Sequence, residues 1–220
     1  MARELRKHDV EAMAIRADVS GKDDVRTMLR TMLDAWDTID LLVANAGLQQ
    51  DAAVTAMTLA PWNTVIGVNF TGAFLCAREA AREMIRRGPR PEVSRATGKL
   101  LFISSVHERI PWVGRVNDTT STGGRRQLMQ SRAQELAPHR IRVNSIGPGA
   151  IQTPIDRSAW DTPEALQRLL GLIPDGRLVQ PEDIGKSAVW LCSDDLDYVH
   201  GPTLFVAGGM TLYPDFARGG

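Results

Sequence analysis

The stretch IDLLVANAG, residues 39–47, has the pattern of a buried strand that ends in a tight turn. Residues 39–45 are apolar at nearly every position up to the terminal Asn45, which is typical of a parallel strand covered on both faces. Asn45-Ala46-Gly47 then supplies residues that favour a turn. Two further strands of this buried kind are predicted at residues 99–104 and 141–146.

Helical patterns separate these strands. Ser20 is the expected N-cap of a helix whose apolar residues, from Val25 to Trp36, recur at helical spacing. The other predicted elements are helices at about 61–87 and 119–137, helices that begin at Pro163 and Pro181, short strands at 12–17 and 203–206, and a basic surface loop at 86–98. Strands that alternate with helices predict an α/β fold around a mostly parallel sheet.

Composition and charge narrow the class of protein. The chain has 220 residues, of which 43% are hydrophobic and 24% charged, and this fits a single globular domain, residues 1–220. Lys plus Arg and Asp plus Glu both total 26, so no net charge favours nucleic acid or an anionic membrane as a partner. A small uncharged or mixed-charge ligand is the better expectation.

Cysteine usage and the chain's start suggest the compartment. Cys76 and Cys192 are the only cysteines and do not form a CxxC motif, so we predict no metal site. The first ten residues lack the apolar stretch of a signal peptide, and no apolar run is long enough to span a membrane. We therefore expect a cytoplasmic protein.

Three turns follow three of the predicted parallel strands. They are Asn45-Ala46-Gly47, Ser104-Ser105, and Gly147-Pro148-Gly149 with Thr153 beyond it. Each one alone is ordinary turn chemistry. Because ligands of parallel α/β sheets bind at the carboxyl ends of the strands, the three together predict one ligand-binding crevice.

Several segments, taken in order, resemble the short-chain dehydrogenase/reductase family, and the likeness covers nearly the whole chain. They are ADVS at 17–20, ANAG at 44–47, VNFTGAF at 68–74, ISS at 103–105 and RVNSIGPG at 142–149. Finer segments resemble glucose 1-dehydrogenases: SSVHERIPW at 104–112, GPGAIQTPI at 147–155 and GPTLFVAGGMTLYPDF at 201–216. The resemblance implies a Rossmann-like, doubly wound parallel sheet with helices on both faces.

The resemblance also implies a cofactor, a substrate class and a set of site residues. The cofactor would be NAD or NADP, and the substrate a sugar or alcohol whose hydroxyl carbon exchanges a hydride with the nicotinamide. The implied cofactor-binding residues are Asp18 at the adenine, Asn45, Ala46 and Gly47 near the adenosine ribose, and Pro148, Gly149, Ile151 and Thr153 toward the nicotinamide. Ser105 would hold the reacting oxygen, Asn69 a relay water, and His107 and Glu108 the substrate.

The chain departs from the family pattern at the catalytic pair. Asp118 stands thirteen positions after Ser105, where the family places its Tyr, and Thr122 stands four residues later, where the family places its Lys. In the family Lys lowers the Tyr pKa and holds the nicotinamide ribose, while Tyr exchanges the hydroxyl proton. Asp118 and Thr122 cannot replace them, so we expect activity to be lost.

A second departure lies at the start of the chain. The family's Gly-rich turn, T-G-x-x-x-G-x-G, holds the cofactor pyrophosphate, and this sequence has no such segment. By resemblance the first βαβ portion is missing, which would describe an N-terminally truncated domain. The strand at 39–45 would then lie at an open edge of the sheet, which would favour poor solubility.

Three interpretations stay open at this point. The first is a degenerate relative of a glucose 1-dehydrogenase, a pseudoenzyme. The second is a working dehydrogenase whose start is misassigned, so that upstream coding sequence restores the Gly-rich turn. The third is a non-catalytic subunit, because family members usually assemble as tetramers through the long helices, here at about 61–87 and 119–137.

Overall fold

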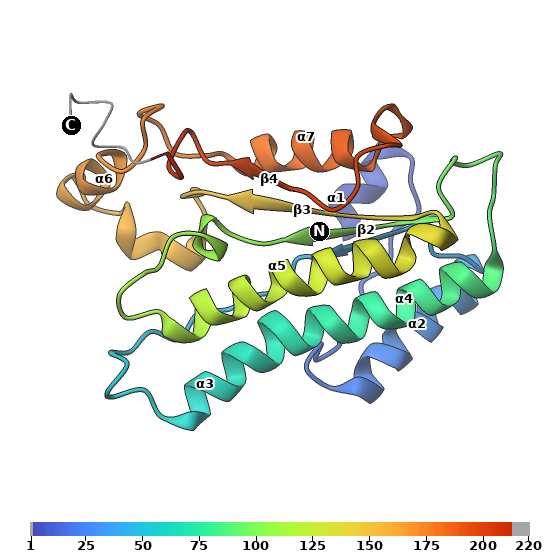
Figure 1. Cartoon of the computed structure of the whole chain (residues 1–220), viewed down its shortest axis with the longest axis horizontal. Coiled ribbons are helices and arrows are strands. Elements are labelled where there is room, and N and C mark those ends of the chain that lie inside the picture. The colour runs from blue at the N-terminus through green and yellow to red at the C-terminus, as the bar shows by residue number, and fades with distance from the viewer. Residues whose placement is uncertain (1, 213–220) are drawn as a thin grey trace.

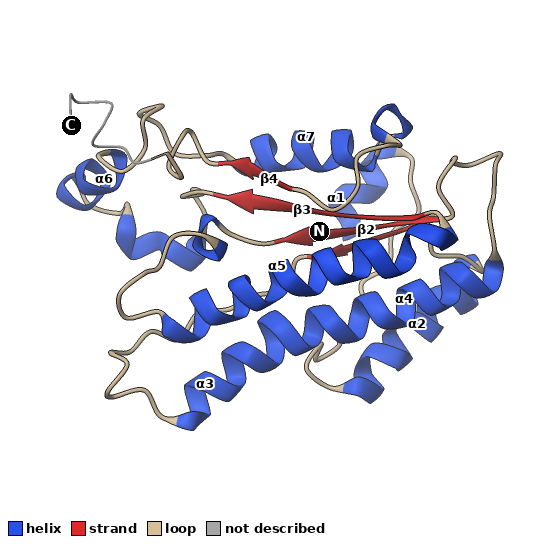
Figure 2. Cartoon of the chain, in the orientation of Figure 1, coloured by secondary structure: helices blue, strands red, loops and turns tan. Residues whose placement is uncertain are grey.

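The sheet of the computed structural model, which describes residues 2–212, consists of four parallel strands (Figure 2). Their order is β1-β2-β3-β4, so each strand lies beside the next one in the chain. The strands are β1 (Leu41–Ala44), β2 (Gly98–Ile103), β3 (Ile141–Pro148) and β4 (Thr203–Val206). The predicted parallel α/β fold is confirmed.

Helices cover both faces of this sheet (Figure 1). The larger core lies between the sheet and the helices α2 (Lys22–Trp36), α4 (Ala73–Arg87) and α5 (Val116–Leu136). A smaller core lies on the other face, under α7 (Pro181–Cys192). The remaining α-helices are α1 (Ala2–Leu5), α3 (Leu59–Val65) and α6 (Pro163–Leu170).

The strand predicted to be covered on both faces is instead the edge strand. Leu42 of β1 packs against the larger core, but Leu41 and Val43, which point to the opposite face, are 43% and 45% exposed. Val43 is in register with Leu101 of β2, which α7 does cover. The expectation of two covered faces is therefore wrong, because α7 packs on β2, β3 and β4 and stops short of β1.

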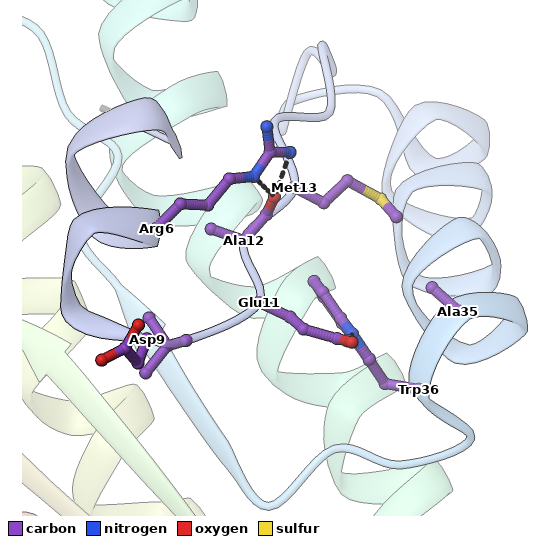
Figure 3. Close-up of a pocket in the computed structure, with 8 residues that line it drawn as sticks. Arg6, Asp9, Glu11, Ala12, Met13, Ala35 and Trp36 are labelled. Carbon is purple, nitrogen blue, oxygen red and sulfur yellow. Dashed lines mark hydrogen bonds between the residues drawn. The ribbon is translucent and has the colours of Figure 1, made fainter.

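The strand predicted at 12–17 is also absent, because these residues have no strand partner and run as an extended loop. Side chains hold that loop in place. The Arg6 guanidinium donates to the carbonyl of Ala12, and the Trp36 indole N–H donates to the Glu11 carboxylate at 2.6 Å. These groups line an open hollow of about 590 Å³ between the N-terminal helix and the end of α2 (Figure 3).

Ser20 does not cap the helix that follows. The helix begins at Lys22 after Gly21 as N-cap, with no side-chain cap bond. Ser20 instead donates to the Asp18 carboxylate from its hydroxyl at 2.7 Å and from its backbone N–H at 2.9 Å. These bonds lower the pKa of Asp18. The cap prediction was wrong because the side chain of Asp18, two residues earlier, forms the turn itself.

The long helix predicted at about 61–87 is interrupted in its middle. Residues Ile66–Gly72 form a π-helical segment between α3 and α4. Such wide turns are rare and occur often at functional sites. Asn69 lies in this segment with its side chain buried, so the wider turn places an amide inside the molecule.

The basic loop at 86–98 lies on the surface in its first part and is anchored at its end. Asp194 accepts hydrogen bonds from the Ser94 hydroxyl at 2.6 Å and from Lys99 at 2.7 Å. These bonds hold the pKa of Asp194 well below its ordinary value. The anchor ties the loop to the short turn after α7.

Candidate functional site

The three predicted turns line one cleft at the carboxyl ends of the strands. The cleft has a volume of about 370 Å³ and lies where β1, β2 and β3 end. Of the expected site residues its wall contains Asn45, Gly47, Asn69, Ser105, Asp118, Thr122, Pro148, Gly149, Ile151 and Thr153. Parallel strands end at the same edge, which brings the turn residues together, and Asn69, Asp118 and Thr122 reach the cleft from the π-helical segment and α5.

Other predicted site residues lie elsewhere. Ala46 is exposed in its turn and is not part of the cleft wall. Asp18 is likewise outside that wall, and its carboxylate is engaged by Ser20. Their roles toward an adenosine group stay predictions.

Backbone bonds fix the segment that follows β3. The Gly149 N–H donates to the Val206 carbonyl at 3.1 Å. A Cβ on Gly149 would lie 3.0 Å from Ala207, so this close approach favours glycine. Further along, Ile151 forms a parallel bridge with Val179. The segment is therefore a rigid wall of the cleft rather than a loose loop.

Asn69 locks the loop after β1 with two hydrogen bonds. Its side-chain oxygen accepts from the Leu48 N–H at 2.9 Å, and its amide nitrogen donates to the Leu48 carbonyl at 3.0 Å. The same nitrogen lies 3.4 Å from a carboxylate oxygen of Asp118. Asn69 thus links the loop at 45–49 to α5.

The residues after β2 divide between two environments. Ser105 accepts from the His107 N–H at 3.1 Å and caps a short 3-10 turn, Val106–Glu108. The Glu108 side chain is fully buried, accepts from the Ser104 hydroxyl at 2.8 Å and lies 3.9 Å from Arg126. Glu108 does not belong to the wall of the cleft, nor to that of the smaller cavity beside it, which Ser105 and His107 line. Its predicted contact with a substrate therefore has no geometric support.

Asp118 and Thr122 lie on the inner face of α5, as their four-residue spacing requires. Both are buried, at 7% and 4% exposure. The Thr122 hydroxyl donates within the helix, to the carbonyls of Asp118 and Thr119, each at 3.1 Å. Thr122 therefore presents no charge to the cleft, and its hydroxyl proton is used by the helix backbone.

Sequence reasoning missed a third residue on this face, Arg125. It lies three residues after Thr122, lines the cleft and is 4% exposed. Its guanidinium donates to the carbonyls of Ile103 and Asn69. Burial lowers the pKa of Arg125 to about 10, an effect that the Asp118 carboxylate opposes. Its spacing from Asp118 and Thr122 was the signal that could have placed it here.

A second cavity of about 200 Å³ adjoins the cleft. Gln49, Ser105, Gly149 and Ile151 belong to the walls of both. The rest of its wall is mainly apolar and includes Trp112 and Trp160. The His107 ring lines this cavity, lies 4.4 Å from the Trp112 ring, and has Nδ1 2.9 Å from the Ile110 carbonyl.

A family model described as "Enoyl-(Acyl carrier protein) reductase", of the short-chain dehydrogenase type, matches residues 1–211. The chain belongs to the short-chain dehydrogenase/reductase family. This short-chain dehydrogenase/reductase is 38% identical over 208 residues to 3beta-hydroxysteroid dehydrogenase 1 of Eggerthella lenta, covering 94% of the chain and 77% of that protein. It is also 38% identical over 213 residues to glucose 1-dehydrogenase 2 of Bacillus subtilis, covering 96% and 79%.

Solved structures agree with this assignment. The short-chain dehydrogenase/reductase described here superposes on a gluconate 5-dehydrogenase from Burkholderia cenocepacia, solved in complex with NADP and tartrate, with a TM-score of 0.88. Sequence identity is 30%, and the match covers 96% of this chain and 80% of that one. The chain is therefore of the NAD(P)-dependent oxidoreductase type to which glucose and gluconate dehydrogenases belong.

The residues of the cleft fit a nicotinamide cofactor in part. The segments at 45–49 and 148–155 contribute most of the wall of this cleft of about 370 Å³. Thr122, however, stands where the family resemblance implies a Lys that would hold the ribose, and its hydroxyl is already bonded within its helix. The cation of the cleft, Arg125, has both terminal nitrogens bonded to main-chain carbonyls. We therefore derive no hydride-transfer step at this site.

The described part of the chain supports neither a metal site nor a membrane-spanning helix. Residues 2–212 contain no group of His, Cys, Asp and Glu side chains that could hold a metal ion. No helix within those residues is long and apolar enough to cross a bilayer.

Proposed function

We propose that this short-chain dehydrogenase/reductase binds a small hydroxyl- or keto-bearing molecule in the cleft at the strand ends but does not oxidise or reduce it. The observation that carries the proposal is the inner face of α5, which presents Asp118 and Thr122 to the cleft; by the family resemblance, these are the positions of the Tyr and Lys. The family membership and the relatives support the kind of ligand, a sugar or another alcohol.

The chemistry of the two side chains supports the loss of activity. A family Tyr, with a reference pKa of about 10, exchanges a proton with the substrate oxygen when a nearby cation lowers that pKa. An aspartate has a reference pKa of about 4 and a shorter reach. Asp118 is also close to Asn69, and Thr122 brings no charge. Positioned acid/base catalysis contributes roughly 10² to 10⁴ in rate, and this factor would be lost.

The test is an assay of NAD(P)H absorbance on the purified chain, with glucose, gluconate and simple secondary alcohols as substrates. Glucose 1-dehydrogenase 2 of Bacillus subtilis serves as the positive control. We expect rates equal to those of buffer with either cofactor. The Ser105→Ala variant guards against a contaminating enzyme, since contaminant activity would be the same in both preparations.

Turnover by the wild-type chain that disappears in Ser105→Ala would overturn the proposal. It would show that the site reacts with Asp118 and Thr122 in place.

A further inference from the structure

The second cavity has a wall that suits an apolar ligand. Val106, Ile110, Ile151 and Leu172 contribute aliphatic surface, and Trp112 and Trp160 contribute aromatic surface. Apolar area removed from water stabilises a complex by about 25 cal/mol per Å². A ring system that fills this cavity would therefore gain most of its affinity from contact with these six side chains.

Several of the polar groups around the cavity are used within the protein, and the Gln49 amide stands where the cavity meets the cleft. The Nδ1 atom of His107 faces the Ile110 carbonyl at 2.9 Å, and the His107 N–H is bonded to the Ser105 oxygen. The Glu108 carboxylate, which a sugar hydroxyl could have used, is buried outside the cavity against Ser104. A buried hydroxyl without a partner is costly, so a ligand with hydroxyls on every side fits this wall poorly.

A small number of donors is still available to the ligand. The Ser105 hydroxyl accepts from His107, so its own proton can go to an oxygen of the ligand. The Trp160 indole N–H is buried and has no hydrogen-bond partner among the residues that the structure describes. These donors suit a ligand with one or two oxygens on an otherwise apolar body. The cavity, at about 200 Å³, is too small for a folded protein segment and matches a small molecule.

We infer that this cavity binds the apolar ring system of an alicyclic or aromatic alcohol or ketone, with the ligand oxygen at Ser105, in preference to a sugar. The inference rests on the proposed function, since this cavity adjoins that cleft and shares Ser105 with it, and it names the substrate class. It does not depend on catalysis, because it concerns binding alone.

The experiment measures binding to the full chain without cofactor. The probes are decalone and decalol, which are bicyclic and carry one oxygen, and glucose. Saturation-transfer NMR detects weak binding, and tryptophan fluorescence reports contact with Trp112 and Trp160. We expect transfer to both bicyclic probes, with a change in fluorescence, and no response to glucose.

A matched pair of variants locates the binding. Ile110→Gln places an amide in the cavity wall, whereas Ile85→Gln makes the same change on α4, at a residue outside both cavities. We expect Ile110→Gln to weaken decalone binding at least about tenfold and Ile85→Gln to leave it unchanged. Thermal melts of both variants confirm that each is folded, and Ile110→Val, which stays apolar, should retain most of the affinity.

Three outcomes would overturn the inference. They are binding of glucose as tight as that of decalone, absence of decalone binding to the folded wild-type chain, and equal loss of affinity in Ile110→Gln and Ile85→Gln. Turnover of glucose in the absorbance assay would overturn the proposed function instead, so the two failures are distinguishable.

Discussion

The guanidinium of Arg125 on α5 donates a hydrogen bond to the main-chain carbonyl of Asn69 in the π-helical segment. Its other terminal nitrogen donates to the carbonyl of Ile103 at the end of β2. One buried cation thus ties together the two segments that carry Asn69 and Ser105. The positive charge of this site comes from Arg125 and not from residue 122.

Thr122→Lys, the substitution that would restore the family residue, should destabilise the protein. The new ammonium group would lie one turn before Arg125 on the same buried face, and the Asp118 carboxylate cannot neutralise two cations. We expect a loss of about 3 kcal/mol in the free energy of unfolding, measured by urea denaturation. Arg125→Leu by itself loses the bonds to the carbonyls of Ile103 and Asn69, so the comparison is a double-mutant cycle: Thr122→Lys should cost less in the Arg125→Leu background than in the wild type.

The control for Thr122→Lys is Thr120→Lys, which adds the same charge at an exposed position of α5. It should change stability by less than about 0.5 kcal/mol. If Thr122→Lys alone is as stable as the wild type, or if it costs as much in the Arg125→Leu background as in the wild type, then repulsion from Arg125 is not the cause.

Asn69→Ala should release the loop after β1. The substitution leaves the N–H and the carbonyl of Leu48 without their partners, and we expect a cost of about 2 kcal/mol. Hydrogen exchange is the sharper measurement, because the Leu48 amide should lose protection before the strands do. Asn63→Ala, at an exposed site on α3, should leave that amide protected. Unchanged protection of Leu48 in Asn69→Ala would contradict the prediction.

Acid stability should depend on Asp194. Its pKa is lowered in the folded state by Lys99 and Ser94, so its contribution is present above the unfolded pKa of about 4 and is lost as pH falls toward the folded value. Asp194→Asn should therefore lower the urea midpoint at pH 7 and flatten its decline from about pH 5 to pH 2. Asp195→Asn, at an exposed neighbouring position, is the control. If the urea midpoints of the two variants depend on pH in the same way, the role of Asp194 is contradicted.

The exposed face of the edge strand should make the protein self-associate. Leu41 and Val43 are exposed on β1, which pairs only with β2 among the described strands. Val43→Lys should reduce concentration-dependent association in sedimentation velocity, because a charge on an edge strand opposes pairing with another chain. Val54→Lys, in an exposed loop, should have little effect. A wild-type chain that stays monomeric at high concentration would show that the exposed strand β1 does not drive association.

Much of the fold could be predicted because it depends on local patterns. Strand β4 occupies the predicted residues, Thr203–Val206, and α6 and α7 begin at the predicted Pro163 and Pro181. Proline at the first position of a helix and apolar runs in parallel strands are signals within a few residues. The cleft was predictable for a related reason, since the ends of parallel strands meet at one edge.

The sequence by itself determined the parallel α/β class, the four strands of the sheet and the family, and it predicts that Asp118 and Thr122 stand in place of the family's Tyr and Lys. Only the tertiary structure decided which surfaces are covered. It left Val43 exposed, gave residues 12–17 no strand to pair with, buried Arg125 beside Asn69, and turned Glu108 away from the apolar cavity. The reason is physical: periodicity is a property of neighbouring residues, whereas burial and side-chain direction depend on elements far away in the chain that pack against them.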